Sequence, residues 1–318
     1  MSVLGEKRRA VVFLACSIIV FLVSMLIVNA TMTGGFSVKK KSVEFVTDDG
    51  VTMTGTVFVP NTATNETRAA GVVVAPGGNT PGQFYASFEL ELARRGYVVF
   101  SYNYYGTAGS EMSMAGNSGA DAAMKYLSNL SFVDKNRLAA IGHSNGGMQA
   151  SAAITGEAAS GAQKRSVVFI GCGIPETDPA SYDNINLMAV WGKLDECGQG
   201  VFWDVVHTDK LNFSTFADLV GLKSDSVEVG KIYGRADDNS LRVVYTPNSF
   251  HMLSNLIPST VTQVCDFMDM TLDGNVAGIE ANSLIYIWQE IFLHVAALSL
   301  CVMIFPVGSF VLDTKYFS

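Results

Sequence analysis

The stretch Gly142-His-Ser-Asn-Gly146 places a serine between two glycines with the spacing G-x-S-x-G. An apolar run at 138–141 precedes it and small residues at 150–153 follow it, so the pattern predicts a strand, a sharp turn and a helix. A turn of this kind holds its serine in a strained backbone conformation and projects the hydroxyl above the sheet. Glycines are needed on both sides because strand and helix pass too closely there for a Cβ. Ser144 is therefore the candidate nucleophile.

A serine nucleophile needs a general base, and the chain has four histidines. His143 adjoins the nucleophile, and its side chain is expected to leave the turn on another side. His294 lies in a C-terminal apolar segment, and His207 lies in a stretch expected to be helical. His251 follows the last apolar strand, at 241–245, which is where the chain order nucleophile, acid, base places the histidine. His251 is the candidate base.

The base in turn needs a carboxylate that orients it. Asp195 lies in the turn after the apolar strand at 187–191, which is the strand before that of the histidine. Glu196 is the runner-up, because a shift of one residue would bring it into the same place. The order Ser144, Asp195, His251 gives the assignment to Asp195 its weight.

An oxyanion hole needs two preorganised N–H donors. The residue after the nucleophile, Asn145, is expected to supply one backbone N–H. The second is expected from the glycine-containing turn at 76–79, which directly follows the apolar run at 71–75. Glycines let the backbone approach a substrate closely, and Gly78 is the candidate donor.

Apolar strands alternate with helical segments along residues 37–280, which are expected to form one domain. The later strands are unbroken apolar runs, which indicates a mostly parallel sheet covered by helices on both faces. An antiparallel hairpin around Asp48-Asp49-Gly50 is expected at one edge. The expected strands lie at 43–47, 51–59, 71–75, 97–102, 137–141, 166–170, 187–191 and 241–245. The expected helices lie at 84–95, 119–130, 144–155 and 261–270.

The 318-residue chain is 49% hydrophobic and only 16% charged, and the apolar excess lies at its two ends. Residues 10–30 form an uncharged run long enough to cross a hydrocarbon core about 30 Å thick. Basic residues at 7–9 precede it, so residues 1–9 are expected in the cytoplasm and the following domain outside it. A cleaved signal peptide is the competing interpretation. The run exceeds the apolar region of about 7–15 residues usual for such a peptide, which favours a retained anchor.

A second apolar segment spans residues 283–312 and is followed by a short tail at 313–318. Its first part holds Gln289, Glu290 and His294, and is expected at the membrane interface or against a partner. No basic residue lies between Arg242 and Lys315, so the C-terminus is expected to return to the cytoplasm. The alternative is an amphipathic helix docked on the domain. Two spans would also allow assembly through the transmembrane helices.

The net charge of −8 and the absence of a basic stripe argue against a nucleic-acid partner. The three domain cysteines have no C-x-x-C spacing, so no zinc site or disulfide framework is indicated. A disulfide between Cys172 and Cys197 is kept as an alternative to two free thiols, since both residues follow strands near one sheet edge. Residues 196–240 allow either a helix with a small lid over the site or ordinary packing onto the sheet.

With these residues identified, the domain resembles the α/β-hydrolase superfamily, and within it the dienelactone-hydrolase-like and polyester-hydrolase-like esterases. The resemblance covers residues 41–270. It rests on the segments 72–78, 96–99, 142–147 and 192–195 and on the late His251. It implies the α/β-hydrolase fold, with Ser144 as nucleophile, His251 as base and then acid, Asp195 as its orienter, and Gly78 and Asn145 as oxyanion donors. The chain departs from the lipase type, having no H-G-G-G loop.

The sequence thus predicts a membrane-anchored serine hydrolase that cleaves carboxylic esters through an acyl-enzyme, with its domain outside the cytoplasm. Small-molecule, lipid or polymer esters are the expected substrates, and no metal or organic cofactor is implied. An acyltransferase that passes the same acyl group to an envelope or lipid acceptor is one alternative. A non-catalytic membrane scaffold, which would be expected to have a broken triad, is another.

Overall fold

The computed structural model describes residues 3–113, 119–175, 178–197 and 214–314. The chain divides into two compact units. The sheet unit comprises Ser37–Leu284, and the helix unit comprises Met1–Phe36 with Ile285–Ser318.

One eight-stranded sheet organises the sheet unit, with the order β1-β2-β4-β3-β5-β6-β7-β8. The strands are β1 (Val38–Val46), β2 (Thr52–Pro60), β3 (Ala69–Ala75), β4 (Val98–Tyr102), β5 (Val133–His143), β6 (Lys164–Ile170), β7 (Asn186–Val190) and β8 (Arg242–Tyr245). β2 runs antiparallel to both of its neighbours, β1 and β4. All the remaining neighbouring pairs, from β4–β3 to β7–β8, are parallel. The predicted mostly parallel sheet with an antiparallel edge is confirmed.

The edge hairpin forms where the sequence predicts it. Thr47 closes the turn, and its N–H donates to the carbonyl of Val51 at 3.0 Å. β1 begins five residues earlier than the predicted 43, at Val38. The added residues include three exposed lysines at 39–41, which hide the strand from a hydrophobic pattern and protect a sheet edge from pairing with another chain.

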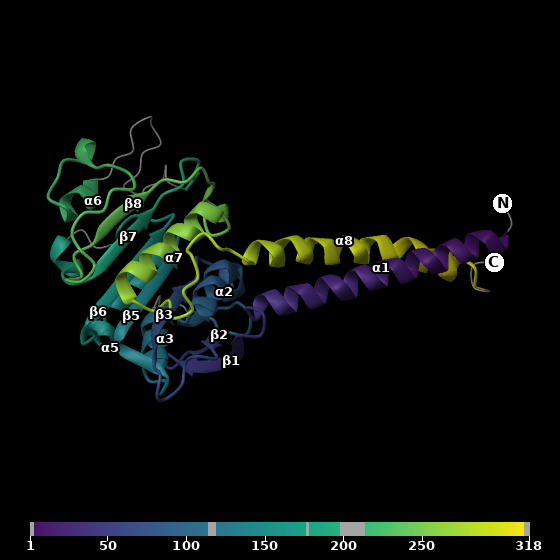
Figure 1. Ribbon diagram of the computed structural model, residues 1–318, viewed down its shortest axis with the longest axis horizontal. Coiled ribbons are helices and arrows are strands. Elements are labelled where there is room, and N and C mark those ends of the chain that lie inside the picture. The colour runs from purple at the N-terminus through teal and green to yellow at the C-terminus, as the bar shows by residue number, and fades with distance from the viewer. Residues whose placement is uncertain (1–2, 114–118, 176–177, 198–213, 315–318) are drawn as a thin grey trace. The chain divides into compact units, whose positions relative to one another are not determined.

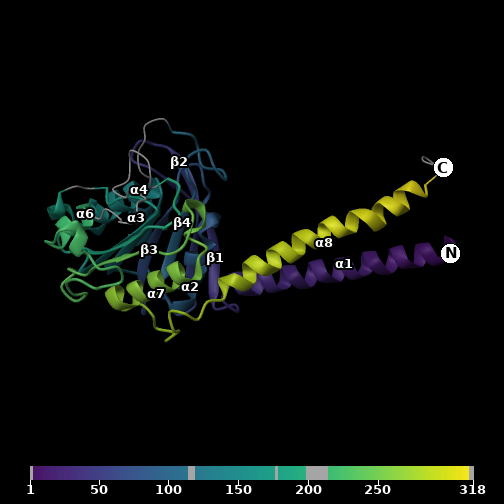
Figure 2. The same ribbon diagram turned by 90° about the horizontal axis from the view of Figure 1, so that it is seen from above.

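Helices cover both faces of the sheet, as Figure 2 shows, with α3 and α4 over one face and α2 and α7 over the other. The helices are α2 (Ala86–Arg95), α3 (Gly119–Ser128), α4 (Gly146–Thr155), α5 (Glu157–Ser160), α6 (Ser214–Leu219) and α7 (Pro258–Leu272). Short 3₁₀ turns are η1 (Gly82–Tyr85), η2 (Pro179–Tyr182), η3 (Ser224–Ser226) and η4 (His251–Leu253). Gly96 caps the C-terminus of α2, and its φ of 121° suits glycine.

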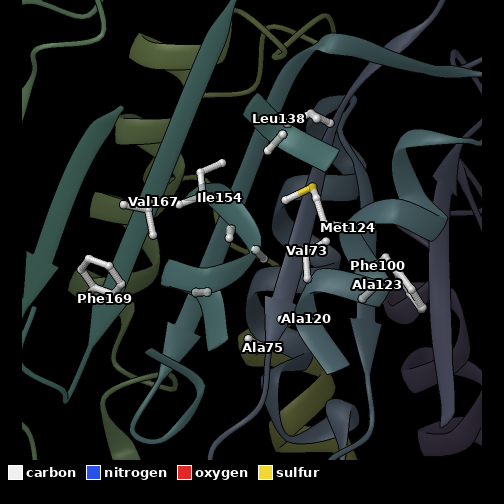
Figure 3. Close-up of a cluster of buried hydrophobic side chains, with 14 of the residues drawn as sticks. Val73, Ala75, Phe100, Ala120, Ala123, Met124, Leu138, Ile154, Val167 and Phe169 are labelled. Atoms are coloured by element: carbon white, nitrogen blue, oxygen red, sulfur yellow. The ribbon is translucent and has the colours of Figure 1, made fainter. Parts of the chain in front are cut away.

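Alternate residues of the central strands build the core beneath α3 and α4 (Figure 3). Val73 of β3, Leu138 of β5 and Val167 of β6 lie in this cluster with Met124 of α3 and Ile154 of α4, and all five side chains are fully buried. Strand residues of the opposite parity, such as Val72, are also fully buried. Both faces of each central strand are therefore apolar, which explains the unbroken apolar runs in the sequence.

The helix unit consists of α1 (Val3–Met32) and α8 (Tyr286–Leu312), which lie side by side and antiparallel (Figures 1 and 2). Lys7 near the start of α1 pairs with Asp313 just after α8, at 3.1 Å. The start of α1 and the end of α8 therefore lie at the same end of this helix pair. The buried side chains of the pair include small ones that allow close helix packing, namely Ser17, Ser24, Ala296 and Ser299. Lys7–Met32 and Tyr286–Leu312 are each long and apolar enough to span a membrane.

Candidate active site

Four loops meet at the carboxyl edge of the parallel strands. Ser144 follows β5, Asp195 comes after β7, His251 after β8, and Gly78 after β3. Because these strands run in the same direction, the turns that follow them open on the same edge of the sheet. The topology therefore brings together residues that are separated by up to 173 positions in the sequence.

The turn at Ser144 has the strained geometry that the G-x-S-x-G pattern predicts. Ser144 has a φ of 55°, a value that non-glycine residues adopt only at a cost. A Cβ on Gly142 would lie 2.2 Å from the carbonyl oxygen of Gly146, and one on Gly146 would lie 2.2 Å from that of Ala75. Both contacts are impossible, so both glycines are required. The Ser144 N–H donates to the carbonyl of Ile170 at 2.9 Å, which fixes the turn to β6.

Ser144, His251 and Asp195 form a continuous hydrogen-bonded line. The Ser144 hydroxyl lies 2.9 Å from Nε2 of His251. On the other side of the ring, Nδ1–H of His251 donates to both carboxylate oxygens of Asp195, each at 3.0 Å. Asp195 and His251 are each only 4% exposed, whereas Ser144 is half-buried. The geometry assigns the imidazole proton to Nδ1 and leaves Nε2 free to accept the serine proton.

The loop after β7, which carries Asp195, is hydrogen-bonded to the loop after β8, which carries His251. The N–H of Lys193 donates to the carbonyl of Pro247 at 2.9 Å, and that of Leu194 to the carbonyl of Ser249 at 3.2 Å. Asp195 is further held by the N–H of Cys197 at 2.9 Å. The two loops thus extend the β7–β8 pairing beyond the sheet and bring Asp195 under the ring of His251.

Glu196, the runner-up for the acid, has a different partner. Its Oε2 accepts the backbone N–H of His251 at 3.0 Å. This bond, together with one from its own N–H, lowers the pKa of the Glu196 carboxyl. Glu196 therefore holds the backbone of the histidine, while Asp195 holds its ring.

Gly171 also belongs to the site, although the sequence reasoning missed it. It follows β6 and has a φ of 59°. A Cβ at this position would lie 3.1 Å from Nδ1 of His251 and 3.2 Å from Oδ2 of Asp195. Only glycine combines this backbone conformation with room for the Asp195–His251 pair. A glycine directly after an apolar strand at the catalytic edge was the available signal.

Two backbone N–H groups are free to bind an oxyanion. Among the described residues, the N–H groups of Gly78 and Asn145 have no hydrogen-bond acceptor. Both residues are exposed and adjoin the turn at 142–146 that carries Ser144, called the elbow from here on. A Cβ on Gly78 would lie 3.7 Å from Nδ2 of Asn145. The Asn145 side chain donates to the hydroxyl of Tyr104 at 3.2 Å. The geometry suits the pair of donors that the sequence predicts.

His143 lies beneath the site, in contact with the catalytic loops. Its Nε2–H donates to the carbonyl of His251 at 3.0 Å, and its Nδ1 accepts from the hydroxyl of Tyr85 at 3.0 Å. That hydroxyl in turn accepts the N–H of Gly77 at 2.8 Å. Burial, and then the nearby His251, lower the pKa of His143 to about 4. The ring is therefore neutral near pH 7, as these bonds require.

The two cysteines near the site are free thiols, so the Cys172–Cys197 bridge is not formed. The Cys172 thiol is buried and packs against Gly147, whereas Cys197 is exposed. Ligand atoms of Asp195, Cys197 and His251 lie within 4.8 Å of one another. Two of these three residues are already bonded to each other as the acid and base pair. His207 and residues 198–213 of the expected lid region lie outside the described residues.

Comparisons with known proteins concern the family and the fold of the chain. The prolyl oligopeptidase family matches residues 84–160, a segment that runs from η1 through the elbow and includes α4. An esterase of Pyrococcus furiosus, Pf2001, is 13% identical over 76% of this chain and 93% of its own, with a TM-score of 0.52. DcsB, solved with a substrate analogue, is 13% identical over 76% of this chain and 100% of its own, with a TM-score of 0.50.

A dienelactone hydrolase-like promiscuous phosphotriesterase from metagenomic libraries is 16% identical over 84% of this chain and 98% of its own, with a TM-score of 0.47. No curated protein matches the chain in sequence. At these identities the structural likeness concerns the fold. The chain thus has the α/β-hydrolase fold, and both the family match across the nucleophile turn and the line from Ser144 to Asp195 are those of a serine hydrolase.

Proposed function

We propose that this protein is a membrane-anchored esterase that cleaves carboxylic esters through an acyl-enzyme. The observation that carries the proposal is the contact of 2.9 Å between the Ser144 hydroxyl and Nε2 of His251, backed by the Asp195 carboxylate at 3.0 Å. A hydroxyl so close to a neutral imidazole can lose its proton as it attacks a carbonyl carbon.

The reaction proceeds in two halves. Ser144 Oγ attacks the ester carbonyl while His251 Nε2 takes the serine proton, and Asp195 stabilises the resulting imidazolium. The collapse of the tetrahedral intermediate releases the alcohol, which receives the proton from His251. Water then attacks the acyl-enzyme while His251 takes a proton from it, and as the acid product leaves, His251 passes that proton to Oγ and restores Ser144.

The negative charge of each tetrahedral intermediate falls on the former carbonyl oxygen. The N–H groups of Gly78 and Asn145 are the proposed donors to that oxygen. Their support is that both lack an acceptor among the described residues and adjoin the nucleophile. A donor of this kind contributes about 10²- to 10³-fold to kcat.

Large apolar side chains within four residues of the triad members in the sequence favour a substrate with apolar substituents. They are called the apolar rim here and are between 43% and 65% exposed, namely Met148, Leu194, Phe250, Met252 and Leu253. Contacts with an acyl or alcohol group would remove this surface from water. We therefore assign an ester of a small molecule, lipid or polymer with an apolar portion as the substrate class.

The two apolar helices would anchor the enzyme in a membrane. Basic residues at 7–9 precede the first span, and by the positive-inside rule they support a cytoplasmic N-terminus. The Lys7–Asp313 pair supports the return of the C-terminus to the same side. In this topology the sheet unit lies outside the cytoplasm, and further helices could assemble on α1 and α8 through the membrane.

The test is the turnover of 4-nitrophenyl esters by the full chain in detergent, together with labelling by a fluorophosphonate. Ser144→Ala is expected to abolish both. Ser160→Ala is the matched control, because Ser160 is exposed on α5 and bonds only within its own turn. Undiminished turnover or labelling of Ser144→Ala would refute the proposal. Protease protection in intact cells tests the topology, and a sheet unit that is cleaved only after the membrane is opened would contradict it.

A further inference from the structure

A chain of hydrogen bonds runs through the interior from the turn at 76–79, which carries the Gly78 oxyanion donor, to the catalytic His251. The Gly77 N–H donates to Tyr85 Oη at 2.8 Å, and Tyr85 O–H donates to Nδ1 of His143 at 3.0 Å. His143 Nε2–H then donates to the carbonyl of His251 at 3.0 Å. Tyr85, His143 and His251 are at most 4% exposed, so water does not compete for these bonds and their geometry is well defined.

At one end, the connection fixes the direction of an oxyanion donor. The Gly77 carbonyl accepts from the Thr80 hydroxyl at 2.8 Å and from the Thr80 N–H at 3.2 Å. Tyr85 Oη accepts the N–H of Gly77, so both backbone groups of Gly77 are hydrogen-bonded. In a planar trans peptide the N–H points opposite to the preceding carbonyl. Since Thr80 holds the Gly77 carbonyl, the Gly78 N–H must point away from the turn.

At the other end, the connection fixes the backbone of the general base. The His251 carbonyl is bonded to His143, and the His251 N–H is bonded to Glu196. With both backbone groups held, the position of the His251 ring depends little on the exposed residues around it. His143 is also the residue before Ser144, so the same side chain ties the base to the nucleophile.

We propose that Tyr85 and His143 are positioning residues, which hold the Gly78 N–H and the imidazole of His251 in register with Ser144. Neither side chain would touch the substrate. Each acts through a backbone group of another residue, and a displacement of about 1 Å at such a group can cost about 100-fold in rate. The inference rests on the proposed esterase function.

The first test compares two tyrosine variants of the full chain with a 4-nitrophenyl butyrate substrate. Tyr85→Phe removes the hydroxyl between Gly77 and His143. We expect its kcat per active site to fall about 10- to 100-fold with KM changed less than about threefold. Tyr97→Phe is the matched control, because Tyr97 is fully buried and its hydroxyl donates to Asp269 at 2.8 Å, outside the site. Its kcat is expected to stay at the wild-type value.

The second test compares two substitutions of His143. His143→Leu removes both ring nitrogens, whereas His143→Gln keeps an N–H donor that can reach the carbonyl of His251. We expect a loss of kcat for the leucine variant similar to that of Tyr85→Phe, and a recovery of about tenfold in the glutamine variant. The end point of fluorophosphonate labelling counts the folded active sites, so a variant that merely folds poorly loses sites without losing kcat per site.

The proposal is overturned if Tyr85→Phe keeps the kcat per site of Tyr97→Phe, or if the leucine and glutamine variants of His143 have equal kcat. Ser144→Ala separates this failure from failure of the esterase function. If Ser144→Ala is inactive while the positioning variants turn over at the wild-type rate, only the positioning role is lost. If Ser144→Ala remains active, the esterase assignment itself falls.

Discussion

Glu196 accepts the backbone N–H of His251 at 3.0 Å, while its neighbour Asp195 binds the ring of the same histidine at 3.0 Å. Two adjacent carboxylates thus hold one residue at two places. The ring bond selects the imidazole tautomer and stabilises positive charge during turnover, and the backbone bond only holds the loop. The two acids should therefore contribute unequally to catalysis.

Neutral isosteres of the two acids separate these roles. We expect Asp195→Asn to lower kcat by about 10³- to 10⁴-fold, because an amide can hold the wrong tautomer and cannot stabilise an imidazolium. Glu196→Gln keeps an acceptor for the His251 N–H and should lower kcat by less than about tenfold. Steady-state kinetics on a 4-nitrophenyl ester measures both. Equal losses in the two variants would contradict the assignment of Asp195 as the acid of the triad.

The elbow glycines should tolerate no side chain. A Cβ on Gly142 would lie 2.2 Å from the Gly146 carbonyl oxygen, a backbone atom that cannot rotate away. Overpacking of this kind costs about 3 kcal/mol or more, which for a unit of this size lowers the Tm by roughly 6–12 °C. Gly161→Ala is the control, since its Cβ would meet nothing within 4 Å. Thermal unfolding in detergent checks the pair, and an unchanged Tm for Gly142→Ala would refute the packing argument.

The main features of the fold were predictable because each strand is marked by a short apolar run within the sequence itself. The runs at 71–75 and 187–191 are apolar throughout, as strands buried on both faces must be, and both appear as strands. The start of β1 was missed because its exposed lysines at 39–41 stand on a sheet edge, where burial leaves no pattern. Helix α4 starts at Gly146 rather than the predicted 144, because the strained turn occupies the two residues before it.

The site was predictable only in part, for a related reason. Chain order could point to Ser144, Asp195 and His251, because each follows a recognisable strand. The partnership of Tyr85 with His143 spans 58 residues and depends on how η1 packs beneath the elbow. A buried tyrosine in an apolar stretch has no local mark that separates this role from ordinary packing, so only the folded structure identifies it.

The apolar rim predicts a preference for longer acyl chains. Leu194 is 52% exposed and Met252 is 43% exposed, and each adjoins a triad residue in the sequence. Since each buried methylene contributes about 0.8 kcal/mol, we expect Leu194→Ser and Met252→Ser to lower kcat/KM for 4-nitrophenyl octanoate about three- to tenfold more than for the acetate. Ile232→Ser, at an equally exposed residue distant in sequence from the triad, is the control. A chain-length profile unchanged in both rim variants would show that the rim does not bind the acyl group.

Glu89 on α2 should make the stability of the sheet unit fall as pH rises. It is 2% exposed, and burial raises its pKa from 4.5 to about 7. Between these two values the folded protein binds a proton that the unfolded chain has released, so the free energy of unfolding decreases as pH increases. At about 1.4 kcal/mol for each pKa unit, the total change amounts to a few kcal/mol. Glu89→Gln cannot ionise and should remove this dependence, which gives the variant a higher Tm than the wild type at pH 8.

The measurement for Glu89 is the Tm of the full chain in detergent between pH 5 and pH 8. Glu44→Gln, an exposed residue on β1, serves as the control and should follow the wild-type curve. The difference in Tm between Glu89→Gln and the wild type should widen from pH 5 to about 7 and then level off, because above the folded-state pKa the carboxylate is ionised in both the folded and the unfolded state. A constant difference across this range would mean that Glu89 keeps the same charge in the folded and unfolded states, and that its burial does not favour the neutral form.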